Sequence, residues 1–154
     1  MLHDFNLANR RVRLWQRTGE SYEHVLMKAL GYAMFVGEYP HLQIETKIGL
    51  RYKPDLIAGG AAADGEFSFW GECGQNSIRK TLWILKHTRT ERLVLFKIGI
   101  NTEQLTKQLR EEIPAKYRAD GKLTLINFVS GIAGLTADKQ IAKVERDWFS
   151  EVKI

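Results

Sequence analysis

The chain has 154 residues, of which 44% are apolar and 27% charged, a composition typical of a folded domain and not of a disordered chain. Its formal charge of +5 favours polyanionic partners without requiring one. A single cysteine excludes an internal disulfide, and no uncharged apolar run approaches the roughly 20 residues of a membrane helix. We therefore expect one domain over residues 1–154, in the cytoplasm and without a membrane partner.

The opening segment, from His3 to Arg17, predicts a β-hairpin. Apolar and polar residues alternate on both sides of a turn at Ala8-Asn9-Arg10. Because side chains two apart share one face of a strand, Arg11, Arg13 and Arg17 lie together. They serve either as phosphate contacts or as the solvated charge of an edge strand.

Thr18-Gly19-Glu20 opens a predicted helix that runs to about Phe35, with Thr18 as its candidate N-cap and Glu20 in its first turn. Glu23 falls within the apolar arc of this helix. Burying an unpaired carboxylate costs several kcal/mol of folding free energy. Glu23 therefore either contacts a metal ion, a cation or a hydrogen-bond donor, or it lies at the rim of the arc and extends into water. The helix dipole is enough to explain Glu20, and we expect His24, which is displaced from the arc, to be exposed.

Two apolar, strand-like runs follow, and each ends in an acid. Alternation over residues 47–57 predicts a strand that carries Arg51, Lys53 and Asp55 on one face. After a loop at 58–65, residues 66–73 predict a second strand with Glu72 near its end. Whether Asp55 and Glu72 meet depends on how the two strands pair.

The remainder alternates helices and strands, which indicates parallel pairing beside the earlier hairpins and hence a mixed sheet. A helix from Asn76 or Ser77 to His87 has a buried stripe at Ile78, Leu82 and Leu85. Its other face is basic and aromatic, which suits either a nucleic acid or plain solvation. We further expect strands at 92–100 and 123–129 and helices at 102–112 and 136–149.

The two acids suggest metal-dependent cleavage of phosphodiesters. Such cleavage needs a nucleophilic water and compensation of the negative charge that grows on the phosphate, and Mg²⁺ or Mn²⁺ held by carboxylates supplies both. Asp55 and Glu72 would hold the ion together with a backbone carbonyl near Cys73, and Glu23 would reach it directly or through water. Thiol chemistry at Cys73 is a weaker hypothesis, because alternation turns this side chain toward the apolar face.

Three blocks carry a family resemblance: Glu20-Ser21-Tyr22-Glu23, Pro54-Asp55-Leu56, and Glu72-Cys73-Gly74-Gln75 followed by Ile78-Arg79-Lys80. In their order and spacing they resemble the YaeQ family, within the PD-(D/E)xK, or restriction-endonuclease-like, nucleases. The resemblance covers about the first three-fifths of the chain. It implies an α/β domain with an αβββαβ core, Asp55 and Glu72 as metal ligands, and supporting roles for Gln75 and for Glu20 or Glu23.

One position departs from the wider nuclease pattern. That pattern places a lysine two residues after the second acid, where it orients the water and offsets charge, but this chain has Gly74 there. Gln75 serves only if the strand ends or bulges after Glu72, while Lys80 or Lys53 would substitute in charge.

We therefore predict a nuclease-like phosphodiesterase that acts on DNA, in repair or recombination, with Mg²⁺ or Mn²⁺ as cofactor. The alternative is a catalytically degenerate module that binds nucleic acid or a protein partner. The predicted catalytic residues are Glu23, Asp55, Glu72, Gln75 and Lys80, and the predicted nucleic-acid contacts are Arg11, Arg13, Arg51, Lys53 and Arg79.

Overall fold

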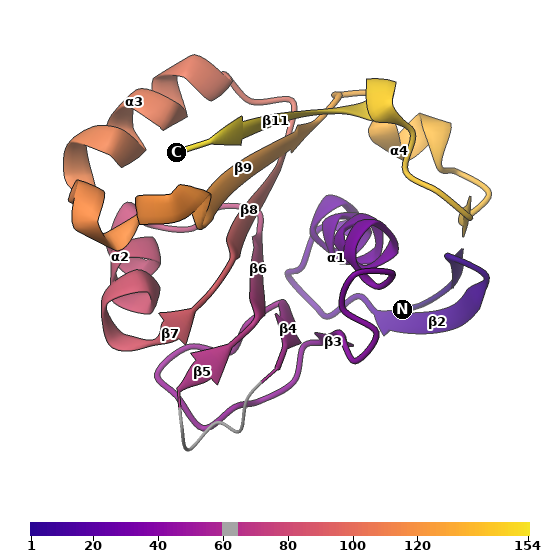
Figure 1. The fold of residues 1–154 in the computed structure, drawn as a ribbon. Helices are drawn as coiled ribbons and strands as arrows, with labels where there is room; N and C mark the ends of the chain where they lie inside the picture. The colour runs from indigo at the N-terminus through magenta and orange to yellow at the C-terminus, as the bar shows by residue number, and fades with distance from the viewer. Residues whose placement is uncertain (60–64) are drawn as a thin grey trace.

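The centre of the protein is a six-stranded mixed sheet with helices on both faces (Figure 1). A computed structural model describes residues 1–59 and 65–154, so most of the loop expected at 58–65 lies outside the described residues. The strand order is β11 (Phe149–Lys153), β9 (Leu123–Phe128), β8 (Leu93–Ile98), β6 (Phe69–Cys73), β4 (Leu56–Ala58) and β3 (Gln43–Ile44). Strands β6, β8 and β9 are parallel, and the outer pairs are antiparallel. The predicted mixed α/β fold is confirmed.

Two hydrophobic layers cover the two faces of this sheet. Helix α1 (Tyr22–Phe35) packs on one face, whereas α2 (Ile78–His87) and α3 (Thr102–Glu112) cover the other (Figure 1). Along β8 the side chains divide accordingly, since Val94 and Phe96 join the α1 layer and Leu93 and Leu95 the opposite one. The expected order of helix, three strands, helix and strand is realised by α1, β3, β4, β6, α2 and β8.

A glycine lets α1 approach the sheet closely. A Cβ atom at Gly31 would lie only 2.6 Å from Leu56 Cδ1 and 2.9 Å from Phe96 Cζ, so a larger residue would push the helix outward. This close packing sets the distance between the first turns of α1 and the start of β4.

The predicted N-terminal hairpin is confirmed as β1 (Leu2–Leu7) and β2 (Arg10–Trp15). Its turn residues Ala8 and Asn9 both have positive φ, at 50° and 65°, which matches the right-handed twist of the flanking strands. The inner face is buried against the α1 layer, and β10 (Gln140–Ile141) extends the hairpin to three strands. A separate parallel ribbon is formed by β5 (Glu66–Phe67) and β7 (Arg89–Thr90).

Two of the expected strands are wrong in extent. Residues 47–55 are irregular, and the strand covers only Leu56–Ala58, so Asp55 precedes β4 instead of ending a strand. The alternating Ile48, Leu50 and Tyr52 pack on the α2 side without pairing to a neighbouring strand, because alternation reports burial and not backbone pairing. The expected strand 66–73 is also interrupted at Ser68, where β5 leaves the main sheet.

The expected C-terminal helix at 136–149 is wrong. Only a short helix α4 (Ile132–Leu135) forms, followed by β10, the 3₁₀ turn η4 (Arg146–Trp148) and β11. Lys139 adopts a positive φ of 58°, a conformation incompatible with a continuing helix. Pairing of β11 with the edge of β9 then decides the local structure.

The other elements of the C-terminal half match their expected positions within a few residues. Strands β8 and β9 and helix α3 are confirmed, and α3 is followed by the 3₁₀ turns η2 (Ala115–Tyr117) and η3 (Ala119–Gly121). Helix α2 also forms, but its buried residues are Thr81, Ile84 and Leu85, whereas Ile78 and Leu82 are half-buried. Among the helices of the described part of the chain, none is long and apolar enough to cross a bilayer.

Candidate functional site

A cleft of about 840 Å³ opens where the first turns of α1 meet the ends of β6 and β8. The segment between β2 and α1, α1 itself, the segment between β3 and β4, the turn after β6, α2 and β8 all contribute to its lining. Charged and titratable side chains dominate that lining and include Glu20, His24, Lys53, Asp55, Lys80 and Lys97.

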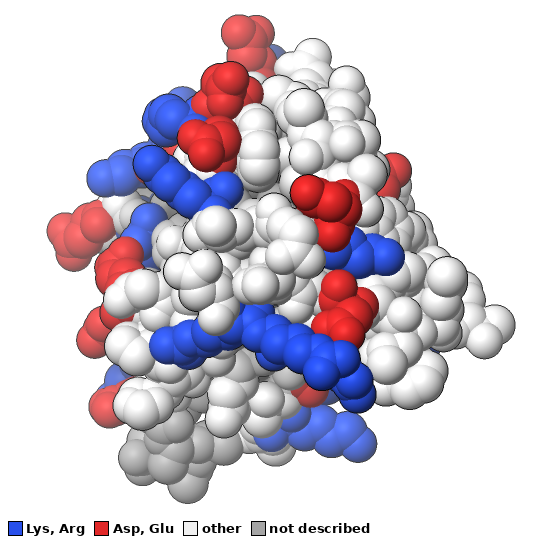
Figure 2. Space-filling view, turned by 90° about the vertical axis from the view of Figure 1, so that its right-hand side faces the viewer, with Lys and Arg blue, Asp and Glu red and all other residues white. Residues whose placement is uncertain are grey.

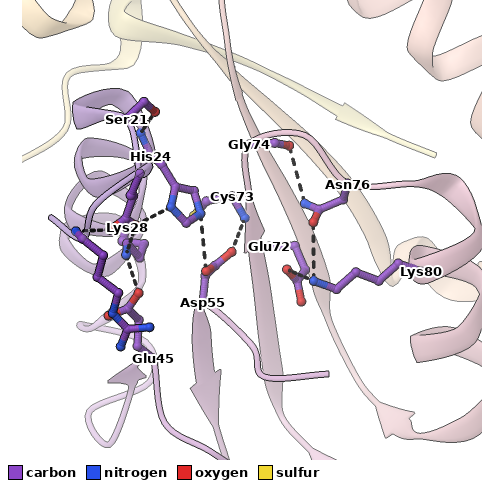
Figure 3. Close-up of polar contacts among 12 residues, drawn as sticks. Ser21, His24, Lys28, Glu45, Asp55, Glu72, Cys73, Gly74, Asn76 and Lys80 are labelled. Atoms are coloured by element: carbon purple, nitrogen blue, oxygen red, sulfur yellow. Dashed lines mark hydrogen bonds and ion pairs between the residues drawn. The ribbon is translucent and has the colours of Figure 1, made fainter. Parts of the chain in front are cut away.

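Strand pairing brings the two predicted acids to this end of the sheet. Leu56 pairs with Gly71 in the antiparallel register of β4 and β6, so the next step of the register sets Asp55 opposite Glu72. Asp55 Oδ2 accepts a hydrogen bond from the Cys73 backbone N–H at 2.8 Å, and Oδ1 lies 3.5 Å from His24 Nε2. The carboxylate of Asp55 is thereby held between β6 and α1 (Figure 3).

Glu72 is more deeply placed, with only 1% of its surface exposed. Its Oε1 accepts from the Trp70 indole N–H at 2.8 Å, and its Oε2 forms an ion pair with Lys80 Nζ at 3.0 Å. Burial, followed by the negative charge of Asp55, raises the pKa of Glu72 to about 7 despite these two donors. Lys80 itself also lies 5.1 Å above the ring of Tyr52, so its ammonium group stands between Glu72 and the solvent.

A buried charge network, which the sequence analysis missed, forms the α1 wall of the cleft (Figure 3). The Lys28 side chain is fully buried and forms ion pairs with Glu20 at 2.7 Å and Glu45 at 2.5 Å. Glu20 also contacts His24 Nδ1 at 2.5 Å. Although burial of Glu20 acts in the opposite direction, Lys28, the Arg17 backbone N–H and His24 lower the pKa of Glu20 to about 2.

Two expectations about this wall are therefore corrected. His24 is not exposed but half-buried, and its contact with Asp55 is the main cause of a raised pKa, which burial opposes. Glu20 does far more than balance a helix dipole, and the N-cap of α1 is Ser21, not Thr18. The spacing of Glu20, His24 and Lys28 by four residues was the available signal, because it puts them on one helix face.

The comparisons with known proteins agree with this architecture. YaeQ from Xanthomonas axonopodis pv. citri has a TM-score of 0.63 and 18% identity, over 94% of this chain and 79% of that chain. YaeQ from Pseudomonas syringae has a TM-score of 0.59 and 16% identity, over 97% of this chain and 90% of that chain. The chain has the YaeQ fold. No family model and no curated protein matches the sequence.

Within this YaeQ fold, Glu23 lies on the exposed surface of α1 at the rim of the cleft. The expected placement inside the apolar arc is wrong, and the rim alternative describes the observed position. Gln75 is exposed and lines the cleft as well. Strand β6 ends at Cys73, and Gly74 has a φ of +81°, so Gln75 does not follow the alternation of a regular strand.

The pairing of β6 and β8 brings an unexpected lysine next to Gly74, the residue that stands where the wider nuclease pattern would have a lysine. Cys73 pairs with Phe96 in the parallel register of β6 and β8, so Lys97 is the residue beside Gly74. The Lys97 ammonium donates a hydrogen bond to the Gly74 carbonyl oxygen and lines the cleft. Burial lowers the pKa of Lys97. Lys53, one of the two substitutes proposed from the sequence, also lines the cleft.

The predicted nucleic-acid contacts are distributed over several surfaces. Arg11 and Arg13 lie on the hairpin and share Asp4, at 2.7 and 3.9 Å. Arg51 is exposed beside the Tyr52 ring, and Arg79 is exposed on α2. On the face that lies at the right of Figure 1, a row of basic side chains is bordered by acidic ones (Figure 2).

The YaeQ fold buries Cys73, and burial raises the pKa of its thiol well above the ordinary value. Such a thiol is not nucleophilic.

Across residues 1–59 and 65–154, no three or more His, Cys, Asp or Glu side chains form a group that could hold a metal ion. An ion at Asp55 would therefore take further ligands from the backbone, water or a phosphate.

Proposed function

We propose that the protein belongs to the YaeQ family, within the PD-(D/E)xK nucleases, and that it hydrolyses phosphodiester bonds in DNA. The three sequence blocks and the shared YaeQ fold support this proposal. The observation that carries it is the register that sets Asp55, just before β4, opposite the buried Glu72 of β6, beside a cleft that Asp55 lines together with Lys53, Lys80 and Lys97.

The residues at this position fit a divalent cation such as Mg²⁺ or Mn²⁺. Carboxylate oxygens are the hard ligands that these ions prefer, and Asp55 and Glu72 supply them. Glu72 Oε2 already binds a positive charge, the Lys80 ammonium. In addition, a cation would relieve the repulsion between Asp55 and Glu72, which adds to burial in raising the pKa of Glu72. When bound, the ion would activate water and stabilise negative charge on the phosphate.

Residues of the chain itself supply the remaining parts of the proposed reaction. Lys53 and Lys97 line the cleft and would bind phosphate oxygens. Gln75 is exposed in the same cleft and would orient a water by hydrogen bonding. Lys80 would shift from Glu72 toward the phosphate as the cation takes its place.

A second function has a specific observation in its favour. Gly74 occupies the position of the motif's lysine, and Lys80 is engaged by Glu72. Both features are compatible with a module that binds nucleic acid or a protein partner and has lost cleavage.

A cleavage assay separates the two functions. Single-stranded, double-stranded and branched DNA are incubated with Mg²⁺ or Mn²⁺ and the wild type, Asp55→Ala or Asp147→Ala, the last being an exposed acid on η4. We expect cleavage by the wild type and Asp147→Ala and a loss of about 100-fold or more in Asp55→Ala. An inert wild type that still binds metal would favour the binding module. Equal metal binding by the wild type and Asp55→Ala, measured by calorimetry, would contradict the metal site.

A further inference from the structure

The imidazole of His24 lies between two carboxylates. Its Nδ1 is 2.5 Å from Glu20 Oε2, and its Nε2 is 3.5 Å from Asp55 Oδ1. Figure 3 shows the ring extending from α1 toward Asp55. Because a carboxylate faces each ring nitrogen, the protonated ring directs an N–H at both, and a metal ion bound at Nε2 would replace the proton there while Glu20 keeps the proton on Nδ1.

The gap between His24 Nε2 and Asp55 Oδ1 can take an ion in place of that proton. Two adjacent ligand atoms at about 2.1 Å from one ion are about 3.0 Å apart in the octahedral geometry of Mn²⁺ and Mg²⁺ and about 3.4 Å apart in a tetrahedral one. The observed separation of 3.5 Å is slightly longer than both values, so a small approach of the two side chains would seat the ion. Asp55 Oδ2 is already bonded to the Cys73 N–H, which directs Oδ1 toward His24.

We propose that His24 Nε2 is a direct ligand of the divalent cation bound by Asp55, and that Glu20 orients this imidazole. The proposal deepens the proposed function, since it concerns the same metal centre. Imidazole nitrogen is a good ligand for Mn²⁺ and other transition metals, whereas Mg²⁺ strongly prefers oxygen. His24 therefore makes the site selective for a transition metal over Mg²⁺.

The surroundings of Glu20 fit this orienting role. A carboxylate on the second nitrogen of a metal-binding histidine fixes the tautomer and the orientation of the ring. Glu20 is itself held by the fully buried Lys28, which also binds Glu45. This chain of contacts fixes the imidazole before a metal arrives. The described residues hold no ready group of three metal-binding side chains, so the cation would complete its coordination with a backbone carbonyl, water or phosphate oxygens.

Calorimetric titration of the metal-free protein with Mn²⁺ and with Mg²⁺ tests the proposal. We expect the wild type to bind Mn²⁺ more tightly than Mg²⁺. His24→Ala should weaken Mn²⁺ binding about 100-fold or more and Mg²⁺ binding much less. Glu20→Gln should weaken Mn²⁺ binding by about 10- to 100-fold. Ser77→Ala removes the N-cap of α2, which contacts neither His24 nor Asp55, so it should lower the Tm and leave Mn²⁺ affinity unchanged.

A second measurement needs no variant. Histidine ring signals are followed by NMR while substoichiometric Mn²⁺ is added to the wild type. The His24 signals should broaden before those of His3, His41 and His87.

The outcomes are distinguishable. Wild-type Mn²⁺ affinity in His24→Ala, together with its loss in Asp55→Ala, would overturn the role of His24 while keeping the metal site. Absence of both Mn²⁺ and Mg²⁺ binding in the wild type would overturn both. Mn²⁺ binding that depends on His24, in a protein that cleaves no DNA, would support the ligand and contradict the nuclease.

Discussion

The two walls of the cleft balance their charges in different ways. On the α1 wall, Lys28 binds both Glu20 and Glu45, and His24 lies between Glu20 and Asp55. The α2 wall consists of Glu72 and of Lys80, which extends from α2. Glu72 is buried there, and its charged partner among the described residues is Lys80. The pKa values follow this contrast, since that of Glu20 is lowered to about 2 and that of Glu72 is raised to about 7.

This contrast separates a framework from a reactive group. Glu20, whose pKa is lowered, and the buried Lys28 that binds both Glu20 and Glu45 fix the first turns of α1 in position. A buried carboxylate with incomplete compensation is costly to the fold, and such groups are concentrated at functional sites. The α1 wall therefore holds the site together, and the α2 wall carries the carboxylate whose charge is incompletely compensated.

The largest expected effect is the loss of the lysine of the α1 wall. Lys28→Met leaves Glu20 and Glu45 without their shared cation in a buried place, so the unfolding free energy at pH 7 should fall by about 3–5 kcal/mol. Lys80→Met should cost less, because Glu72, with a pKa of about 7, takes up a proton when its partner is removed. Urea unfolding of both variants measures the difference, and equal losses would remove the distinction between the walls.

The second expected effect is an opposite response of the two walls to pH. The pKa of Glu20 in the fold lies below its ordinary value of 4.5, so its stabilisation is present above pH 4.5 and lost as the pH falls toward 2. The pKa of Glu72 in the fold lies above its ordinary value of 4.5. The stabilisation that its neutral form provides is therefore fully present below pH 4.5 and is lost as the pH rises through 7. Each contribution is at most about 3–4 kcal/mol.

Two variants isolate these contributions. Glu20→Gln should flatten the stability profile on the acid side, and Glu72→Gln should flatten it between pH 5 and 8. Unfolding free energies from pH 2 to 9, measured in EDTA, provide the profiles. An unchanged slope between pH 5 and 8 in Glu72→Gln would contradict the account of the α2 wall.

The smallest expected effect concerns the helix caps. Ser21 and Ser77 cap α1 and α2 in the same way, each accepting a backbone N–H at 3.1 Å. Ser21→Ala and Ser77→Ala should each cost about 1 kcal/mol of unfolding free energy. Similar losses in chemical denaturation would show that the walls differ in charge and not in helix termination.

Local pattern was sufficient for much of the fold. The hairpin, α3, β8 and β9 follow from alternation, caps and apolar runs, because each is stabilised largely by neighbours close in sequence. The predictions for residues 47–55 and 136–149 were wrong because tertiary contacts determine the secondary structure of both segments. The first packs irregularly on α2, and the second ends as β11 at the edge of β9.

The site could be predicted in part. The sequence placed Asp55 and Glu72 near the ends of two strand-like runs. The register that sets them opposite each other is a property of the folded sheet. The roles of Lys28 and His24 were missed because a charged residue on a helix is normally solvated, and their respective partners Glu45 and Asp55 come from other segments. Lys97 reaches the site only through the parallel pairing of β6 and β8.

The most direct test of the account is an anomalous difference map from crystals grown with Mn²⁺. A peak between His24 Nε2 and Asp55 Oδ1 is predicted, with Glu20 still bonded to His24 Nδ1. A crystal saturated with Mn²⁺ that shows no peak at Asp55, or a peak only at a distant surface, would contradict the account.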